Sequence, residues 1–226
     1  MKKLVIKDTT TIRRKVYLYL REQVLSGEIG PLQRLIEARI AKEIGTSRTP
    51  VREALHTLEM EGLLESIPRV GYKVRTLSDR EVDEICQIRT AIETLAAGWA
   101  IEKDHKKLVN NLRKNIAAME QRVARGEVRA FVDVDAQFHE IIAGLSGSRR
   151  LLELAQTLRG HMVRYRVQSV YVADNVLRAI QGHKAILAAI EKQDQKAVAE
   201  AIRHHLEQAK RDILLYAFKE HGEERN

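Results

Sequence analysis

Four polar side chains interrupt the apolar faces of three predicted helices in the second half of the chain. Asp135 and His139 are four residues apart, so they project from one face of a helix that also carries apolar residues. His183 and His205 each lie between apolar residues of two further helical patterns. A lone histidine on an apolar face is more often a hydrogen-bonded core residue than a ligand. Four such groups, however, would each be costly to bury without a partner.

A divalent metal ion would satisfy the four groups together. One carboxylate oxygen and three imidazole nitrogens suit borderline ions such as zinc, nickel or manganese, and they leave coordination positions open. We therefore predict a metal site formed by Asp135, His139, His183 and His205, with zinc as the expected ion.

These residues must be positioned by a helical domain. From Asp79 onward the apolar residues recur at helical spacing, and no segment reads as a strand. Ser78 and Glu81 form a capping box that would open the first helix. Short connections favour antiparallel neighbours, so residues 78–226 are predicted to form an all-α antiparallel six-helix bundle. The expected helices are 79–103, 105–125, 129–145, 148–172, 174–192 and 195–219.

The segment before this bundle, residues 1–77, contains a second pattern with chemical meaning. Two short amphipathic helices between Leu35 and Leu64 are separated by Gly45-Thr46-Ser47, as in a helix-turn-helix. Ser47 is a suitable N-cap, with a side chain able to accept from an unpaired amide, and Pro50 is tolerated in the first turn.

A predicted β-hairpin follows, with Arg69 at its tip. The two helices alone could be an ordinary helical hairpin with a solvated basic face. A hairpin directly after the second helix instead indicates a wing. A winged helix-turn-helix places the start of its second helix against base edges and phosphates.

Charge and composition support this division of the chain. Residues 1–77 carry a net charge of +6, whereas the remaining residues contribute +2 of the total of +8. A basic segment suits phosphate binding, and a membrane-surface patch is the competing explanation. A single cysteine cannot form an internal disulfide, and no signal peptide or long apolar run is present. A cytoplasmic protein without membrane contact is expected.

The segment from Val16 to Val74 resembles the DNA-binding domain of the GntR superfamily of bacterial transcription regulators. The most specific part is SRTPVREAL, residues 47–55. The resemblance implies that Arg48 and Arg52 read bases or phosphates, that Ser47 and Thr49 contact the DNA backbone, and that Gly71 lets the wing approach the minor groove. The full set of expected DNA-binding residues is Arg34, Ser47, Arg48, Thr49, Arg52, Arg69 and Gly71.

The second half resembles the FCD domain of the FadR subfamily, in its smaller VanR-like form. The likeness rests on Asp135-x-x-x-His139, His183 and the segment AIRHHL, residues 201–206. It implies a dimer and an effector that is a small carboxylic acid, bound beside or on the metal. Arg89 resembles the family arginine that faces the cavity, although a salt bridge with Glu93 is an open alternative. Arg164 is a further candidate for effector binding.

These observations favour a transcription regulator, expected to be a repressor, that binds a palindromic operator as a homodimer. A metal-dependent hydrolase-type enzyme is one alternative, because an open metal site could activate water. We find no general base such as a histidine-glutamate motif beside the ligands, and the DNA-binding half would need a separate reason. In a third interpretation, the metal itself is the signal.

Overall fold

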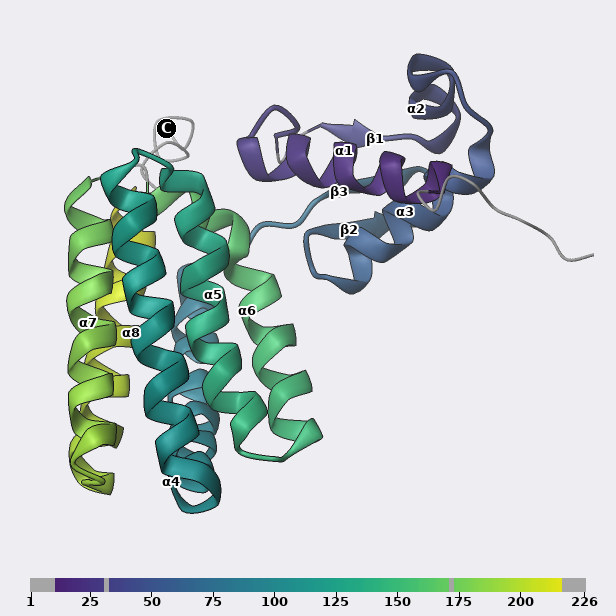
Figure 1. Cartoon of the computed structure of the whole chain (residues 1–226). Helices are drawn as coiled ribbons and strands as arrows, with labels where there is room; N and C mark the ends of the chain where they lie inside the picture. Colours follow the sequence, from purple (N-terminus) through teal and green to yellow (C-terminus); the bar gives the residue numbers. More distant parts are fainter. Residues whose placement is uncertain (1–10, 31–32, 171–172, 217–226) are drawn as a thin grey trace, which may run out of the picture. The chain divides into compact units, whose positions relative to one another are not determined.

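The structure, a computed structural model, describes residues 11–30, 33–170 and 173–216. The chain divides into two compact units, Met1–Thr76 and Leu77–Asn226. Figure 1 shows that the first combines helices with a small sheet and that the second is helical. No helix of the described residues is long and apolar enough to cross a membrane.

The first unit is a winged helix-turn-helix, as predicted. Its three strands form an antiparallel sheet in the order β1-β3-β2, and β2 and β3 make the wing. The helix-turn-helix consists of α2 and α3, joined by a turn in which Gly45 has a left-handed φ of 69°. The elements are α1 (Ile12–Ser26), β1 (Arg34–Leu35), α2 (Glu37–Ile44), α3 (Arg48–Met60), β2 (Leu64–Ile67) and β3 (Gly71–Val74).

Helix α3, the predicted recognition helix, packs closely against the rest of this unit. Val51, Leu55 and Leu58 on one face of α3 are completely buried, and α1 packs against that helix. The hydroxyl of Tyr17 on α1 donates to the carboxylate of Glu61, just after α3, over 2.7 Å. Apolar burial on one side therefore leaves the opposite side of α3 to face solvent.

Ser47 is the N-cap of α3, but its side chain makes no capping hydrogen bond, so that part of the prediction was wrong. An N-cap side chain normally accepts from the amide two or three residues further along the helix. Here the third helical residue, Pro50, has no amide hydrogen, so only the amide of Thr49 could serve, and the side chain of Ser47 does not accept from it. The hydroxyl of Ser47 is therefore not used as a cap at the start of the recognition helix.

The second unit contains the predicted helical segments. Its first helix, α4, is interrupted at Asp104, where φ is −159° and ψ is 74°. The carboxylate of Asp104 accepts from the amide of Lys107 over 2.9 Å and so caps the second half of α4. The capping box of Ser78 and Glu81 is present at the start. The helices are α4 (Asp79–Ala124), α5 (Val128–Leu145), α6 (Arg149–Val170), α7 (Ala173–Glu191) and α8 (Gln195–Tyr216).

The helices of this unit pack as a bundle around α4 (Figure 1). Helices α5, α6, α7 and α8 all contact α4, and the largest core is built mainly from α4, α5, α7 and α8, with Leu151 of α6. A smaller core near the start of α4 joins Leu77 and Cys86 to Met162 and Tyr165 of α6. The amide of Leu77 donates to the Tyr165 hydroxyl over 2.6 Å, which fixes the first residue of this unit to α6.

Gly71 in the wing is required by close backbone packing. Its φ is 144°, and a β-carbon there would lie 2.4 Å from the carbonyl oxygen of Leu35 on β1. We predict that Gly71→Ala lowers the free energy of unfolding of the DNA-binding unit by about 2 kcal/mol, measured by denaturant melting, because the β1–β3 pairing must shift. Gly30→Ala is the control, since a β-carbon at Gly30 would meet no described atom within 4 Å and the φ of Gly30 is not positive. Equal stability of the two variants would contradict this interpretation of the wing.

Candidate functional site

Three buried histidines meet in the core of the helical unit. His139 lies on α5, His183 on α7 and His205 on α8, and each side chain is almost completely shielded from solvent. Each offers one ring nitrogen, and these three atoms all lie within 4.8 Å of one another. Three separate helices thus bring their imidazoles together, as the sequence predicted.

The separation of two of these nitrogens fits a shared metal ion. The Nε2 atoms of His139 and His183 are 3.3 Å apart. Two nitrogens bound to one tetrahedral zinc at about 2.1 Å each would be about 3.4 Å apart. The donor set is chemically suitable as well, since neutral imidazole is a common ligand for zinc, copper, iron and nickel.

Glu93 of α4 orients the ring of His139. The Nδ1 atom of His139 is 2.7 Å from Oε2 of Glu93. Burial alone would raise the pKa of Glu93, but the positive charge of Arg89 and the interactions with His139 outweigh burial and bring that pKa to about 2. An ionised carboxylate only accepts hydrogen bonds, so Nδ1 carries the hydrogen. The other ring nitrogen of His139, Nε2, then faces His183, an arrangement typical of metal-bound histidine.

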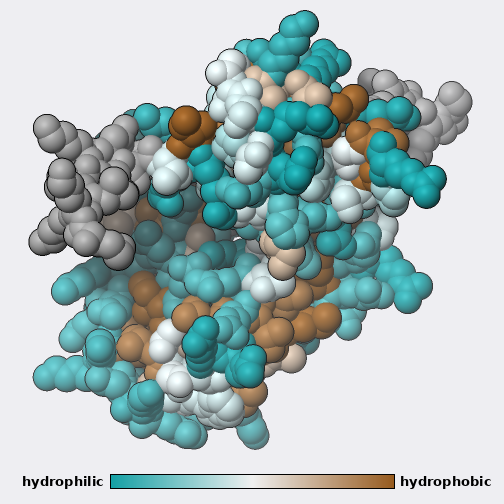
Figure 2. Space-filling view, turned by 90° about the vertical axis from the view of Figure 1, so that its right-hand side faces the viewer, coloured by the Kyte–Doolittle hydropathy of each residue, from teal (hydrophilic) through white to brown (hydrophobic). Residues whose placement is uncertain are grey.

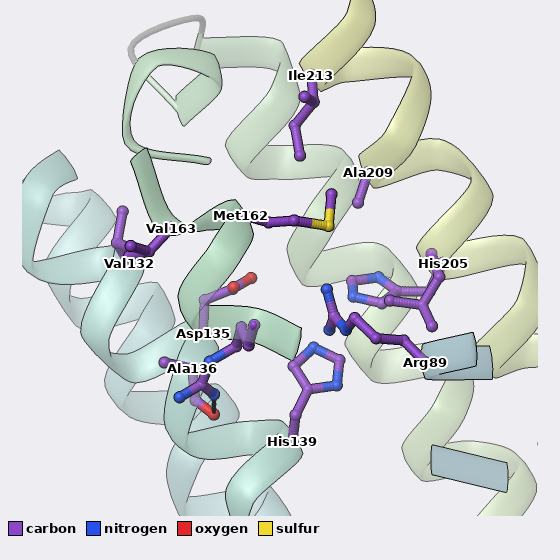
Figure 3. Close-up of a pocket in the computed structure, with 12 residues that line it drawn as sticks. Arg89, Val132, Asp135, Ala136, His139, Met162, Val163, His205, Ala209 and Ile213 are labelled. Carbon is purple, nitrogen blue, oxygen red and sulfur yellow. Dashed lines mark hydrogen bonds between the residues drawn. The ribbon is translucent and has the colours of Figure 1, made fainter. Parts of the chain in front are cut away.

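Arg89 completes this chain of buried polar groups. Its Nε atom donates to Oε1 of Glu93 over 2.9 Å, so the salt bridge that the sequence left open is present. Arg89 also lines the cavity beside His139, and Figure 3 shows its guanidinium near the rings of His139 and His205. A role for Glu93 at the metal site was not predicted from the sequence. The sequence did contain a signal for this role, because Glu93 is a second charged residue, one turn after Arg89, on the side of α4 that faces the core.

Asp135 lies at the edge of the histidine cluster. It is buried, and its Oδ1 atom is 3.8 Å from Nε2 of His183. The three ligand atoms that all lie within 4.8 Å of one another belong to the histidines, and no oxygen of Asp135 is among them. Its carboxylate lines the same cavity as His139 and His205 (Figure 3), so a metal ion held by the imidazoles would have an acidic oxygen close by.

The cavity beside the cluster is mostly apolar. Met162, Val163 and Ile213 cover one part of it, as Figure 3 shows. Arg159 of α6, which was not predicted from the sequence, also lines it and donates to the backbone oxygen of Ala136. The Arg164 side chain, the other predicted effector contact, lies outside the described residues. An apolar cavity with a few converging polar groups is typical of a small-molecule site.

Gly182 is a second site residue that was not predicted from the sequence. A β-carbon at this position would lie 2.4 Å from Nδ1 of His205, so the histidine ring occupies the space of the missing side chain. Glycine inside a helix costs about 1 kcal/mol relative to alanine. Its place in the middle of α7, immediately before His183, was the signal that close packing is needed there.

The residues expected to bind DNA lie on the first unit. All are exposed except Gly71, which is half-buried. Arg69 has a left-handed φ of 64° at the tip of the wing, where Pro68 precedes it. A turn of this shape favours glycine, so an arginine there is maintained at some cost in backbone strain. Arg52 is paired with Glu37 of α2. The residues expected to bind DNA are Arg34, Ser47, Arg48, Thr49, Arg52, Arg69 and Gly71.

A winged helix-turn-helix joined to a helical domain with buried histidines is the architecture of a DNA-binding regulator. Comparisons with known proteins agree. Residues 12–74 match "Bacterial regulatory proteins, gntR family", and residues 84–208 match the FCD domain. The chain belongs to the GntR family of bacterial regulatory proteins and carries an FCD domain. Its relatives are transcription regulators, not enzymes.

Individual relatives support the same assignment. The chain is 30% identical over 205 residues to an uncharacterized HTH-type transcriptional regulator of Streptomyces ambofaciens, covering 90% of this chain and 85% of the relative. It is 29% identical over 198 residues to a probable D-xylose utilization operon transcriptional repressor of Paenarthrobacter nicotinovorans, covering 87% and 86%. The structure resembles Escherichia coli McbR/YncC with a TM-score of 0.73 at 24% identity, covering 91% and 98%, which shows a shared fold.

We predict that Gly182→Ala weakens metal binding at least about ten-fold, because the new methyl group displaces the ring of His205. Zinc titration with a competing chelator measures the affinity, and His183→Ala provides the reference for a lost ligand. The matched control is Gly144→Ala on α5, where a β-carbon meets no described atom within 4 Å. Undiminished zinc affinity in Gly182→Ala, with His183→Ala impaired, would show that His205 is not needed.

Proposed function

We propose that this regulator is a repressor that binds a palindromic operator as a homodimer and responds to a small carboxylic acid at a metal site in its FCD domain. The observation that carries the proposal is the cluster of three buried imidazoles beside a cavity that Arg89 also lines. Zinc is the ion we propose, with nickel and manganese as alternatives, held by His139, His183 and His205 with Asp135 beside them.

The chemistry of the cavity supports a carboxylate effector. A bound divalent ion would supply positive charge and open coordination positions. Arg89 uses Nε for Glu93, which leaves its terminal nitrogens for a second carboxylate. Apolar neighbours such as Met162 and Val163 would shield these interactions from water. A small acid with a short apolar portion matches this combination of charge and surface.

A stripe of exposed apolar side chains on α4 supports the homodimer. Apolar residues reach the surface of the helical unit in several places (Figure 2). On α4, Ile88, Leu95 and Trp99 lie on one face and are 50%, 46% and 42% exposed, with half-buried Ile92 between them. Apolar patches of this kind are typical of protein interfaces. A second copy of the chain is the partner we propose for this face.

The surface of the first unit supports operator binding. Arg48, Thr49 and Arg52 are exposed on the recognition helix, and the hydroxyl of Ser47 is not used as a cap. A two-fold symmetric dimer would place two such helices in successive major grooves, about 10 base pairs apart. Cation contacts to phosphate would make the affinity fall with salt concentration.

We predict that Arg52→Ala weakens operator binding by about ten-fold or more and leaves zinc content unchanged, since Arg52 lies in the first unit and the histidines in the second. Fluorescence anisotropy with an operator selected from a random duplex library measures the affinity. Arg80→Ala is the control for removing an exposed arginine, because Arg80 lies on α4 and pairs with Glu84. Operator affinity equal to that of the unmodified protein would rule out Arg52 as a DNA contact.

A further inference from the structure

The arginine proposed to read DNA is already bound by an acid of the same unit. The Nε atom of Arg52 on α3 donates to both carboxylate oxygens of Glu37 on α2, over 3.2 and 3.1 Å. The Arg52 side chain is 61% exposed, whereas that of Glu37 is only 20% exposed. The pair therefore joins a well-anchored acid to a solvent-facing arginine.

Glu37 is suited to hold the arginine in one place. It is the first residue of α2, where the partial positive charge of the helix N-terminus stabilises a carboxylate. Helix α2 also packs against α3, so the acid and the arginine belong to one rigid pair of helices. A long arginine side chain loses much of its rotational freedom when one edge of its guanidinium is bound in this way.

The bound edge determines what the arginine can contact. Glu37 occupies Nε, which leaves the two terminal nitrogens at the far end of the guanidinium. These nitrogens form the fork that pairs with O6 and N7 of guanine in the major groove. The adjacent carboxylate would also repel a phosphate that approached the same guanidinium. Both effects favour a neutral base edge over the DNA backbone.

We infer that Glu37 is a positioning residue that directs Arg52 to a base and away from phosphate. The inference rests on the DNA contact proposed for Arg52. Glu37 thereby raises the ratio of operator affinity to non-specific affinity, although it carries the same charge sign as DNA. We assign guanine as the base that Arg52 contacts in each operator half-site.

The same helix offers a matched control. Glu43 on α2 pairs with Arg39 of its own helix over 2.8 Å, and both side chains are well exposed. Removing its charge changes the net charge of α2 as much as removing that of Glu37, but leaves Arg52 bound. Any effect due only to overall charge should therefore appear equally in Glu37→Gln and Glu43→Gln.

The test compares unmodified protein, Glu37→Gln, Glu43→Gln and Arg52→Ala. Each full-length protein is titrated with a duplex operator selected by the unmodified protein, with the set of single-base variants of one half-site, and with a scrambled duplex, at several salt concentrations. We expect Glu37→Gln to lose about ten-fold of the preference at the guanine read by Arg52. Glu37→Gln should bind the scrambled duplex more tightly than the unmodified protein does. Its affinity for that duplex should also fall more steeply with salt concentration, by the equivalent of about one additional phosphate contact. Glu43→Gln should keep the base preference.

Two results would overturn the inference, and they are distinguishable. If Arg52→Ala loses the guanine preference but Glu37→Gln keeps it, Glu37 only braces the two helices. If Arg52→Ala itself keeps the preference, the proposed DNA contact of Arg52 fails and the inference fails with it. Thermal melting of each variant checks that the fold is intact, and a structural brace alone would alter melting without altering the base preference.

Discussion

The helical unit depends on a chain of buried polar groups that runs from Arg89 through Glu93 to His139. Ions are expensive to bury, and the expense is offset only where each finds hydrogen-bonding partners. Here the carboxylate of Glu93 accepts from both neighbours, which joins the first half of α4 to α5 at a fixed register. The nitrogen of His139 that remains then lies against His183 and close to His205, so one metal ion would satisfy three imidazoles that the bundle has already brought together.

In our proposed function, this arrangement would give a physical route from effector to operator. The buried face of α4 carries Arg89 and Glu93, and the exposed face of the same helix carries the apolar stripe around Leu95. In our proposal an acid bound beside the metal recruits Arg89, which changes how α4 is held against α5. Since the stripe is the proposed dimer surface, such a change alters how two copies pair. The coupling would come from a difference in effector affinity between the two pairings, as linkage requires.

Much of this architecture could be predicted from local pattern. The histidines stood out because polar residues interrupted apolar helical stripes, and the capping box at Ser78 marked the start of α4. The partnership of Glu93 with His139 was not predictable, because it depends on the register between α4 and α5, which no local spacing reveals. The same applies to Gly182 and His205. The missing cap at Ser47 was a local error, since Pro50 removes one of the two amides that the cap could use.

Thermal melting against a panel of small carboxylic acids, on zinc-loaded and chelator-stripped protein, tests the central claim most directly. A ligand that binds only the native state raises the melting temperature. Our account predicts that at least one acid stabilises the loaded protein and fails to stabilise the stripped protein, and that the same acid changes operator affinity. Stabilisation of both forms by the same acid would contradict a metal-dependent site. Loss of stability on stripping, with no acid acting on the loaded form, would indicate that the ion is structural or is itself the signal.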